Sequence, residues 1–395
     1  MPVNGVLMPP GIELDADQLR HMEQVRDFIA GEIARAGGWI SFERYMDLAL
    51  YAPGLGYYSA GSRKLGRGGD FTTAPEISPL FGACMARQCV EVLGELGSGS
   101  ILELGAGSGA LAVSVLRRLE TLGRLPERYD ILDVSADLRE RQRRLLGERV
   151  PHLLPRLEWA DAPPRCMDGV IIANEVLDAL PVARFRCRDS GCEELGVSVR
   201  GGEFGWSARP AAEHLRRTCA ALAAAGGGWD GSYESEYCPR LATWALAIVQ
   251  GLRRGAALWC DYGLPRSQYY LPQRSCGTLI CHFRHRVYDD PFIRPGLQDI
   301  SAWVDFTALA EAGEAAGCEI AGFTTQAHFL AGLGIDEEMR ILAAGRDDEF
   351  ARLANQAKTL LLPGEMGERF KVMAWTRGLE GSLSGFSLKD MRRSL

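Results

Sequence analysis

A glycine-rich segment between two apolar stretches is the first place where chemistry is expected, and it reads Glu103-Leu104-Gly105-Ala106-Gly107-Ser108-Gly109-Ala110. Between a strand and a helix, such a turn lets backbone N–H groups approach a nucleotide-like ligand closely. The segment therefore predicts a nucleoside site, whose backbone contacts come from Gly105, Ala106, Gly107 and Gly109.

The same glycines also fit a dinucleotide pattern, Gly105-x-Gly107-x-x-Ala110. Charge separates the two ligands, because a dinucleotide carries a pyrophosphate whereas S-adenosyl-L-methionine carries a sulfonium cation and an ammonium group. Glu103, at the end of the first expected strand, suits the cationic ligand better. The residues favour a methyltransferase over a nicotinamide-dependent oxidoreductase, and a glycine turn without function is the third interpretation.

Two aspartates follow the next two expected strands. Asp133 stands near the end of the stretch 129–134, where a carboxylate can accept hydrogen bonds from both ribose hydroxyls. Asp161 follows the stretch 157–160 and is placed to meet the adenine amino group. With Glu103, these residues predict an acidic rim around the nucleoside site.

Candidate catalytic residues follow the fourth expected strand, where Asn174, Glu175 and Asp178 come directly after an apolar run. In an open parallel sheet, the ligand crevice lies beyond the carboxyl ends of the strands. Two carboxylates there can hold a guanidinium by charge-assisted hydrogen bonds and direct one nitrogen at a methyl group. The competing interpretation is structural, with Asp178 capping a helix and Glu175 solvated.

Strands and helices alternate along the chain from residue 100 onward. Seven apolar stretches predict strands, at 100–104, 129–134, 157–160, 169–173, 256–260, 318–324 and 370–377. This alternation is typical of an α/β fold, in which helices cover both faces of a mainly parallel sheet. The carboxyl edge of that sheet would bring the candidate residues together.

The expected organisation has four parts. Residues 1–95 form an N-terminal helical segment with an active-site flap, and 96–182 begin the sheet domain. Residues 183–235 read as an inserted β meander and linker. The remainder, 236–395, completes the sheet domain and carries an insertion at 263–300.

Composition excludes several classes of protein. The 395 residues include 51 acidic and 44 basic side chains, so the net charge of −7 argues against a nucleic-acid partner. No apolar run approaches the roughly 18 residues of a membrane span, and the first residues lack the pattern of a signal peptide. We therefore expect a cytoplasmic protein with no membrane partner.

The eleven cysteines show no Cys-x-x-Cys spacing, which predicts reduced thiols. Cys276, Cys281, His282 and His285 are close in sequence, but they lack the separation between ligand pairs that zinc fingers have. No metal is expected.

Several longer stretches carry a family resemblance. The most specific are Gly69-Asp70-Phe71-Thr72-Thr73-Ala74-Pro75-Glu76-Ile77-Ser78 and Ala173-Asn174-Glu175. Others are the glycine loop, Gly56-Tyr57-Tyr58, Asp178-Ala179-Leu180-Pro181, Asp261-Tyr262-Gly263, Gly277-Thr278-Leu279 and Val304-Asp305-Phe306. Together they resemble the MidA (mitochondrial dysfunction protein A) family of S-adenosyl-L-methionine-dependent methyltransferases, which includes a mitochondrial protein-arginine methyltransferase that assists complex I assembly. The resemblance covers most of the chain.

The resemblance implies a class I methyltransferase (Rossmann-like) fold with a seven-stranded sheet, an N-terminal helical segment and insertions near the active site. It implies S-adenosyl-L-methionine as cofactor and an arginine on a protein as acceptor, with a respiratory-chain subunit as one candidate partner. By this resemblance, the cofactor is cradled by Gly105, Gly107 and Gly109, and its ribose is bound by Asp133. A flap over the site is formed by Asp70, Phe71, Thr73 and Glu76. The substrate is faced by Asn174, Glu175 and Asp178.

Two functional alternatives stay open, a scaffold protein and an NAD-dependent oxidoreductase. An assembly or scaffold protein that retains the cofactor fold without catalysis would share these motifs. Within the catalytic hypothesis, Glu175 is the first choice for orienting the guanidinium nitrogen, with Asp178 second. His285 is either a proton relay or a structural residue of an arginine-rich insertion.

Overall fold

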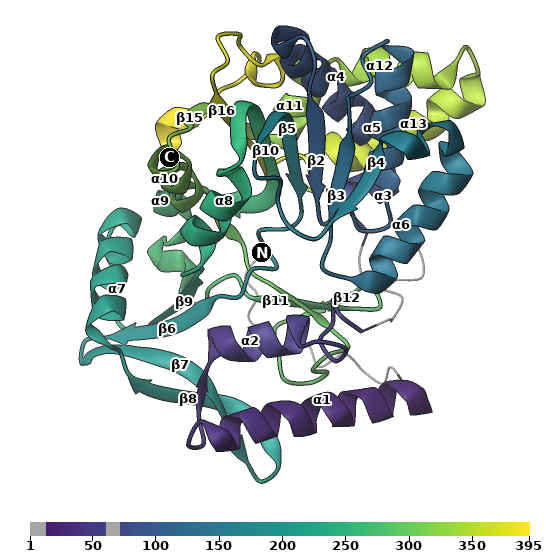
Figure 1. Cartoon of the computed structure of the whole chain (residues 1–395). Helices are drawn as coiled ribbons and strands as arrows, with labels where there is room; N and C mark the ends of the chain where they lie inside the picture. The colour runs from purple at the N-terminus through teal and green to yellow at the C-terminus, as the bar shows by residue number, and fades with distance from the viewer. Residues whose placement is uncertain (1–12, 61–71) are drawn as a thin grey trace. The chain divides into compact units, whose positions relative to one another are not determined.

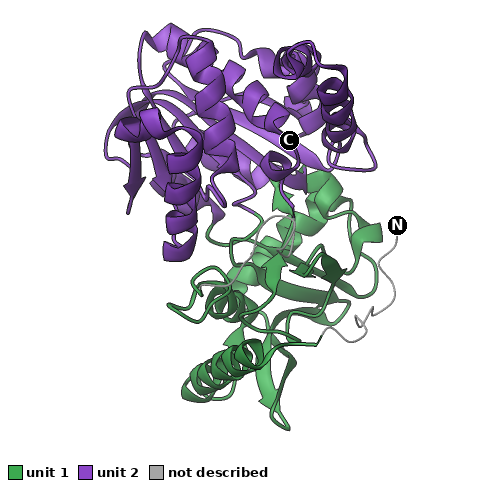
Figure 2. Ribbon diagram, turned by 90° about the vertical axis from the view of Figure 1, so that its right-hand side faces the viewer, with its two compact units in different colours: residues 1–71, 178–240, 265–305 green, residues 72–177, 241–264, 306–395 purple. Residues whose placement is uncertain are grey.

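The computed structural model describes residues 13–60 and 72–395, which divide into two compact units (Figure 2). Unit 1 contains residues 1–71, 178–240 and 265–305, and unit 2 contains the ranges 72–177, 241–264 and 306–395. The four-part division expected from the sequence stays a prediction.

Unit 2 is built on the expected sheet, whose main path runs β15-β16-β10-β5-β2-β3-β4 (Figure 1). In chain order these strands are β2 (Ser100–Leu104), β3 (Tyr129–Leu132), β4 (Leu157–Ala160), β5 (Met167–Asn174), β10 (Leu252–Leu264), β15 (Glu319–Thr325) and β16 (Phe370–Arg377). The five strands from β10 to β4 are mutually parallel, and β16 is antiparallel to both neighbours. The predicted α/β fold with a mainly parallel sheet is confirmed.

The order of the strands determines where a ligand can bind. After β2 the chain builds outward through β3 and β4, then returns to place β5 on the other side of β2. Such a reversal leaves a crevice beyond the carboxyl ends of the two central strands. The glycine loop follows β2, and Asn174 ends β5, so both lie at this switch point.

Helices cover both faces of this sheet. The helices of the unit are α3 (Ala74–Ile77), α4 (Pro79–Leu96), α5 (Ala110–Thr121), α6 (Ala136–Arg149), α8 (Leu241–Val249), α10 (Phe306–Ala315), α11 (Gln326–Gly332), α12 (Ile335–Ala343) and α13 (Asp347–Leu361). On one face, α4 and α5 share a buried core with alternate residues of the strands, such as Ile101 and Val170. On the other, Trp244 of α8 stands 6.1 Å from Trp259 of β10, measured between ring centroids.

Unit 1 contains antiparallel sheets and helices. Its larger sheet runs β1-β7-β6-β9 with β8 also paired to β7, and its strands are β1 (Ile40–Ser41), β6 (Ala183–Arg188), β7 (Gly191–Arg200), β8 (Glu203–Pro210) and β9 (Tyr233–Tyr237). The successive hairpins β6–β7–β8 confirm the predicted meander. A smaller sheet orders β12 (Arg286–Tyr288), β11 (Ile280–Phe283) and β13 (Asp299–Ser301). The helices include α1 (Ala16–Arg35), α2 (Phe42–Tyr51) and α7 (Glu213–Gly226).

The first helix shows how local sequence sets an element. The Asp15 carboxylate accepts a hydrogen bond from the Gln18 backbone N–H, and the Gln18 Oε1 accepts one from the Asp15 backbone N–H, which completes a capping box. Val25, Ile29 and Ile33, spaced four residues apart, form the buried face of the helix.

One expectation about the cysteines is wrong. Cys187 and Cys192 stand opposite each other in the β6–β7 hairpin and form a disulfide. The spacing rule missed this pair because a hairpin register, and not a short Cys-x-x-Cys turn, brings the two sulfur atoms together. Separately, none of the helices in the described part of the chain has both the length and the apolarity that a membrane crossing requires.

A buried ion pair connects α12 to the helix that follows the glycine loop. The Glu338 carboxylate, fully buried, accepts from Arg118 of α5, with its Oε2 2.7 Å from Nε and its Oε1 2.8 Å from Nη2. Arg87 of α4 adds a contact of 3.2 Å to the same carboxylate. The pair therefore fixes α5 against two neighbouring helices.

Removing one partner of this pair should be costly. We expect Glu338→Ala to lower the free energy of unfolding by about 3–5 kcal/mol, because the Arg118 charge would stay buried without its anion. Glu337→Ala is the matched control, since Glu337 is half exposed and pairs with Arg87 at the surface, and it should cost much less because exposed ion pairs contribute little to stability. Urea unfolding of both variants measures the difference, and equal losses would contradict this account.

Candidate functional site

The glycine loop adopts backbone conformations that side chains disfavour. Gly105, Gly107 and Gly109 have φ angles of +58°, +55° and +91°. A Cβ added to Gly105 would also lie 3.0 Å from Cγ2 of Val176. The loop closes with a hydrogen bond of 2.8 Å from the Gly109 N–H to the Ala106 carbonyl, and α5 begins directly after it.

Gln142, fully buried on α6, connects the loop to its surroundings. Its Nε2 donates to the Gly107 carbonyl at 3.0 Å and to Oδ2 of Asp133 at 2.8 Å. Its Oε1 accepts from Nε1 of Trp159, on β4, at 3.0 Å. One amide group therefore fixes the glycine loop, Asp133 and β4 relative to each other.

Sequence reasoning missed Gln142. The signal was present, because Leu138, Gln142 and Leu146 are spaced by four and form the buried face of α6. A glutamine in the middle of an apolar stripe needs buried hydrogen-bond partners, and so marks a position where α6 meets polar groups.

Asp133 lies beyond the end of β3, as expected, with its carboxylate already oriented. Its Oδ1 accepts from the Ser135 N–H at 2.9 Å, while Oδ2 accepts from Gln142. These two hydrogen bonds fix the direction of the carboxylate at the end of the strand. The next residue, Val134, is an apolar side chain that is 76% exposed; the sequence did not predict this exposure, because Val134 falls within the expected strand 129–134.

Asp161 lies just after β4 and forms an ion pair with Arg139 that the sequence did not predict. Nη1 of Arg139 stands 2.8 Å from Oδ1 of Asp161, whose side chain is 90% exposed. Nη2 of Arg139 donates to the carbonyls of Trp159 and Ala160. Arg139 therefore holds α6 against the end of β4 and partly neutralises Asp161.

Glu103 is a buried carboxyl group at the end of β2. It is 2% exposed, and its Oε2 accepts from the Tyr129 hydroxyl at 2.6 Å. Burial raises the pKa of Glu103 to about 7, the Asp133 charge adds to the rise, and the hydrogen bond from Tyr129 opposes it. A cation bound nearby would favour the ionised form of this group.

The end of β5 holds a strained turn. Glu175 has a φ of +55°, in the left-handed region, which costs a side-chain-bearing residue about 1–3 kcal/mol. Its N–H donates to the Cys260 carbonyl at 2.9 Å. Its Oε1 accepts from Nδ2 of Asn174 at 3.2 Å and from the Ala74 N–H at 3.4 Å. The structure thus brings Asn174, Glu175 and α3 together.

Asp261, at the carboxyl end of β10, holds this turn from the other side. Its Oδ2 accepts from the backbone N–H groups of Val176, at 3.2 Å, and Leu177, at 2.9 Å. Its Oδ1 accepts from the Tyr262 N–H. Asp261 appeared in the sequence only as part of the family resemblance. Its position at the end of the strand beside β5 assigns it a positioning role.

The described part of the expected flap lies next to the glycine loop. Glu76 of α3 accepts a hydrogen bond from the Ser108 hydroxyl, within the loop. Thr73 is the N-cap residue of α3 but makes no side-chain capping hydrogen bond. Asp70 and Phe71 lie outside the described residues. Whether these four residues cover a ligand stays a prediction.

Asp178 and His285 belong to unit 1. Asp178 is buried, and its carbonyl accepts from the Ala302 N–H at 3.0 Å. The next regular element after Asp178 is the strand β6, so the interpretation of Asp178 as a helix cap is wrong. His285 is exposed at the two-residue turn between β11 and β12, where Arg284 and His285 both have positive φ. This position gives no support to a proton relay.

Comparison with known proteins identifies the family to which the chain belongs. Residues 84–324 match the family model described as "Putative S-adenosyl-L-methionine-dependent methyltransferase". The chain is also 32% identical to the protein arginine methyltransferase NDUFAF7, mitochondrial, of Danio rerio, over 85% of this chain and 83% of that protein. With the protein of the same name from Homo sapiens the identity is 28%, over 86% of this chain and 80% of the relative.

Two solved structures from Burkholderia thailandensis share the whole fold. One, in complex with S-adenosyl-homocysteine, has a TM-score of 0.93 and 42% sequence identity, covering 97% of this chain and 99% of that one. A native structure has a TM-score of 0.90 and 41% identity, with the same coverage. The cytoplasmic location expected from the sequence is contradicted, because the curated relatives are named as mitochondrial proteins.

The raised pKa of Glu103 makes a prediction about stability. Between about pH 4.5 and pH 7 the folded chain keeps a proton on Glu103 that the unfolded chain releases. The free energy of unfolding should therefore fall as pH rises through this window, by at most about 3 kcal/mol. Glu103→Gln should remove that part of the slope, whereas Glu148→Gln, at an exposed position of α6, should retain it. Urea unfolding from pH 4.5 to pH 8 measures both, and parallel profiles would contradict the assignment.

Proposed function

Since this chain belongs to the family of S-adenosyl-L-methionine-dependent methyltransferases, we propose that it methylates an arginine side chain of a protein. The observation that carries the proposal is the set of hydrogen bonds by which Gln142 joins the glycine loop to the Asp133 carboxylate. The arginine acceptor is supported by the named activity of the curated relatives.

The residues at the loop fit a cationic nucleoside better than a pyrophosphate. Two carboxylates are connected to the loop by hydrogen bonds: Ser108 of the loop donates to Glu76, and Gln142 donates both to Gly107 and to Asp133. A pyrophosphate would meet negative charge here, whereas an ammonium or sulfonium group would be stabilised. This distinction supports the methyltransferase over the nicotinamide enzyme.

Residues on three strand ends would hold the cofactor. The loop glycines Gly105, Gly107 and Gly109, with Ala106, would contact it through the backbone. Asp133 would accept from the ribose hydroxyls, and Val134 would contact the base. Asp161 would meet the adenine amino group, and Glu103 would stabilise the cationic end. When bound, the cofactor supplies a methyl group that its sulfonium already activates, so the protein contributes alignment and electrostatics.

Asn174 and Glu175 would orient the acceptor nitrogen. Within the described residues, the buried Oδ1 of Asn174 has no hydrogen-bond partner, so it can accept from an incoming N–H group. The Glu175 carboxylate is held by Asn174 and the Ala74 N–H, and its strained backbone is fixed through Asp261. A guanidinium is protonated at neutral pH and must lose a proton during or after transfer. A carboxylate beside the acceptor nitrogen can take that proton, and Glu175 would supply it. The role of Asp178, which belongs to unit 1, as a second carboxylate stays a prediction.

The acceptor protein is the finer part of the proposal. A respiratory-chain subunit is a candidate through the family resemblance. A scaffold role without catalysis would retain the loop and its hydrogen bonds, so binding data alone do not separate it from an enzyme.

Methyl transfer itself tests the proposal. Isothermal titration should show binding of S-adenosyl-L-methionine and none of NADH. Incubation of the chain with radiolabelled cofactor and a cell extract should label a protein, and mass spectrometry should place the methyl group on arginine. Label on another residue type would contradict the arginine acceptor, and cofactor binding without label in extracts from its own source would favour the scaffold.

Replacement of Glu175 separates binding from transfer. Glu175→Gln should keep the affinity for S-adenosyl-L-methionine within about twofold while the rate of transfer falls by about tenfold or more, because a positioned charged group is lost. The exposed Glu148→Gln should leave both unchanged. Turnover at the wild-type rate in Glu175→Gln would remove this carboxylate from the mechanism.

Replacement of Gln142 tests the cofactor cradle. Gln142→Leu keeps the volume but removes hydrogen bonds to Gly107, Asp133 and Trp159. Each lost hydrogen bond contributes about 0.5–1.5 kcal/mol to holding the loop and Asp133 in place. Because the cofactor would then have to order these groups when it binds, its affinity should fall about tenfold or more. Gln250→Leu, at an exposed position, is the control. Titration calorimetry measures both, and equal affinities would show that Gln142 does not organise the site.

A further inference from the structure

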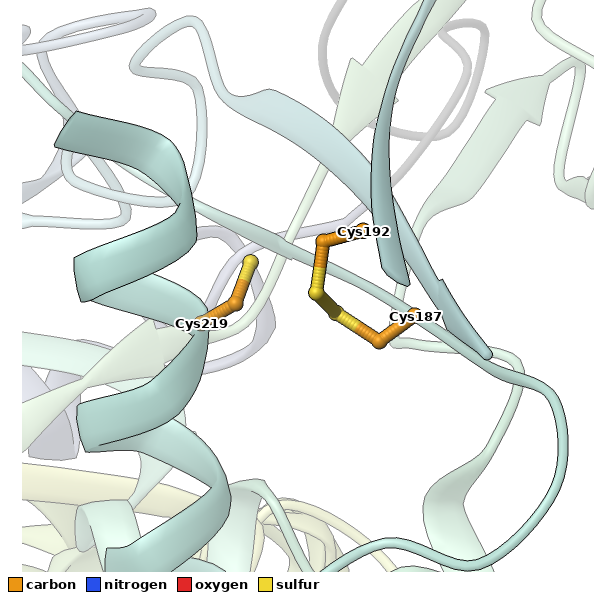
Figure 3. A group of neighbouring side chains, drawn as sticks. All are labelled: Cys187, Cys192 and Cys219. Carbon is orange, nitrogen blue, oxygen red and sulfur yellow. A yellow bond between two sulfur atoms is a disulfide. The ribbon is translucent and has the colours of Figure 1, made fainter. Parts of the chain in front are cut away.

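Three sulfur atoms meet in unit 1, away from the glycine loop in sequence (Figure 3). Cys187 and Cys192 form the hairpin disulfide, and Cys219 extends toward it from α7. The three sulfur atoms lie within 4.8 Å of one another. The Cys219 thiol is 1% exposed and free, so a disulfide and a buried thiol stand within reach of each other.

We propose that Cys187, Cys192 and Cys219 form a thiol–disulfide exchange centre, which takes a small-molecule thiol at the hairpin and in which Cys219 is the resolving thiol. A disulfide that stands within reach of a free thiol can exchange with it. The exchange uses none of the residues proposed for methyl transfer, and it does not depend on the proposed function.

The first step takes place at the hairpin. The turn from Arg188 to Gly191 is exposed, and Cys192, which follows it, is half-buried, so an external thiolate can reach a hairpin sulfur. Its attack forms a mixed disulfide with that sulfur and breaks the Cys187–Cys192 bond. The other hairpin cysteine leaves as a thiolate and takes up a proton from water.

The second step uses Cys219. Its thiolate attacks the hairpin sulfur of the mixed disulfide, forms a bond between helix and hairpin, and expels the external thiol. The exchange consumes no oxidant, because one disulfide replaces another. Burial raises the pKa of Cys219 to about 12, so its thiolate is scarce at neutral pH. The scarcity of the thiolate is offset because Cys219 is held close to the hairpin sulfur atoms, which gives it a high effective concentration. Cys219 therefore suits the second, intramolecular step better than the first.

A metal site is the competing use of three cysteines. Reduced thiolates hold soft metal ions. Structural zinc almost always has four protein ligands, however, and the group found among the described residues offers three. The disulfide already joins two of these sulfur atoms. The observations therefore favour exchange.

Peptide mapping of the full chain tests the proposal. The chain is incubated with a mixture of reduced and oxidised glutathione, quenched with acid, digested and analysed by mass spectrometry. Wild type should show both the Cys187–Cys192 disulfide and a hairpin–Cys219 disulfide. Cys219→Ala should lose the second and accumulate a glutathione adduct at the hairpin, about fivefold or more above wild type, because the mixed disulfide is no longer resolved.

Matched variants guard against an effect of folding. Cys89→Ala removes an equally buried helical thiol of α4 and should behave as wild type. Cys192→Ala retains Cys219 and should form a Cys187–Cys219 disulfide when oxidised glutathione is added, which requires only that the two sulfur atoms are in reach.

Two results would overturn the proposal. One is the absence of any Cys219-linked peptide in wild type and in Cys192→Ala, with equal adduct levels in Cys219→Ala and wild type. The other is stoichiometric binding of zinc(II) to the reduced chain that is lost in Cys219→Ala, since that result would identify a metal site instead.

Discussion

The hydrogen bonds of one buried amide organise the candidate cofactor site. Gln142 donates to Gly107 and Asp133 and accepts from Trp159, so it joins a loop, a strand end and a neighbouring strand. A neutral side chain suits this position because it orients the Asp133 carboxylate without neutralising it. The Gln142 amide therefore adds no charge at the loop, and the loop keeps the conformation that its glycines permit.

The proposed acceptor side of the site depends on a different constraint. Glu175 is held in the left-handed region, a conformation that persists only where surrounding contacts enforce it. Asp261 supplies those contacts by accepting from the N–H groups of Val176 and Leu177, the two residues that follow Glu175. The strain and its support together direct the Asn174 and Glu175 side chains, and such preorganisation is what methyl transfer requires of a protein.

Much of the fold could be predicted from the sequence, because each central strand is an apolar run and the helices show apolar residues at three- and four-residue spacing. The glycine loop, Asp133 and the Asn174–Glu175 turn were found for the same reason, since each follows such a run. Contacts between distant segments could not be predicted. The pairing of Arg139 with Asp161 and the bonds of Gln142 depend on how α6 packs against β4.

The cysteines show the same limit. Cys187 and Cys192 are paired by the register of a hairpin, and Cys219 reaches them from a helix more than twenty residues later in the chain. The expected location failed for a different reason, because the composition of a folded chain carries little information about the compartment in which it works.

A crystal structure with S-adenosyl-homocysteine bound tests the central claim most directly. The account predicts the nucleoside beyond the carboxyl ends of β2 and β3, with the ribose hydroxyls on the Asp133 carboxylate and the Gln142 hydrogen bonds intact. A nucleoside bound elsewhere, or a ribose that makes no contact with Asp133, would contradict it.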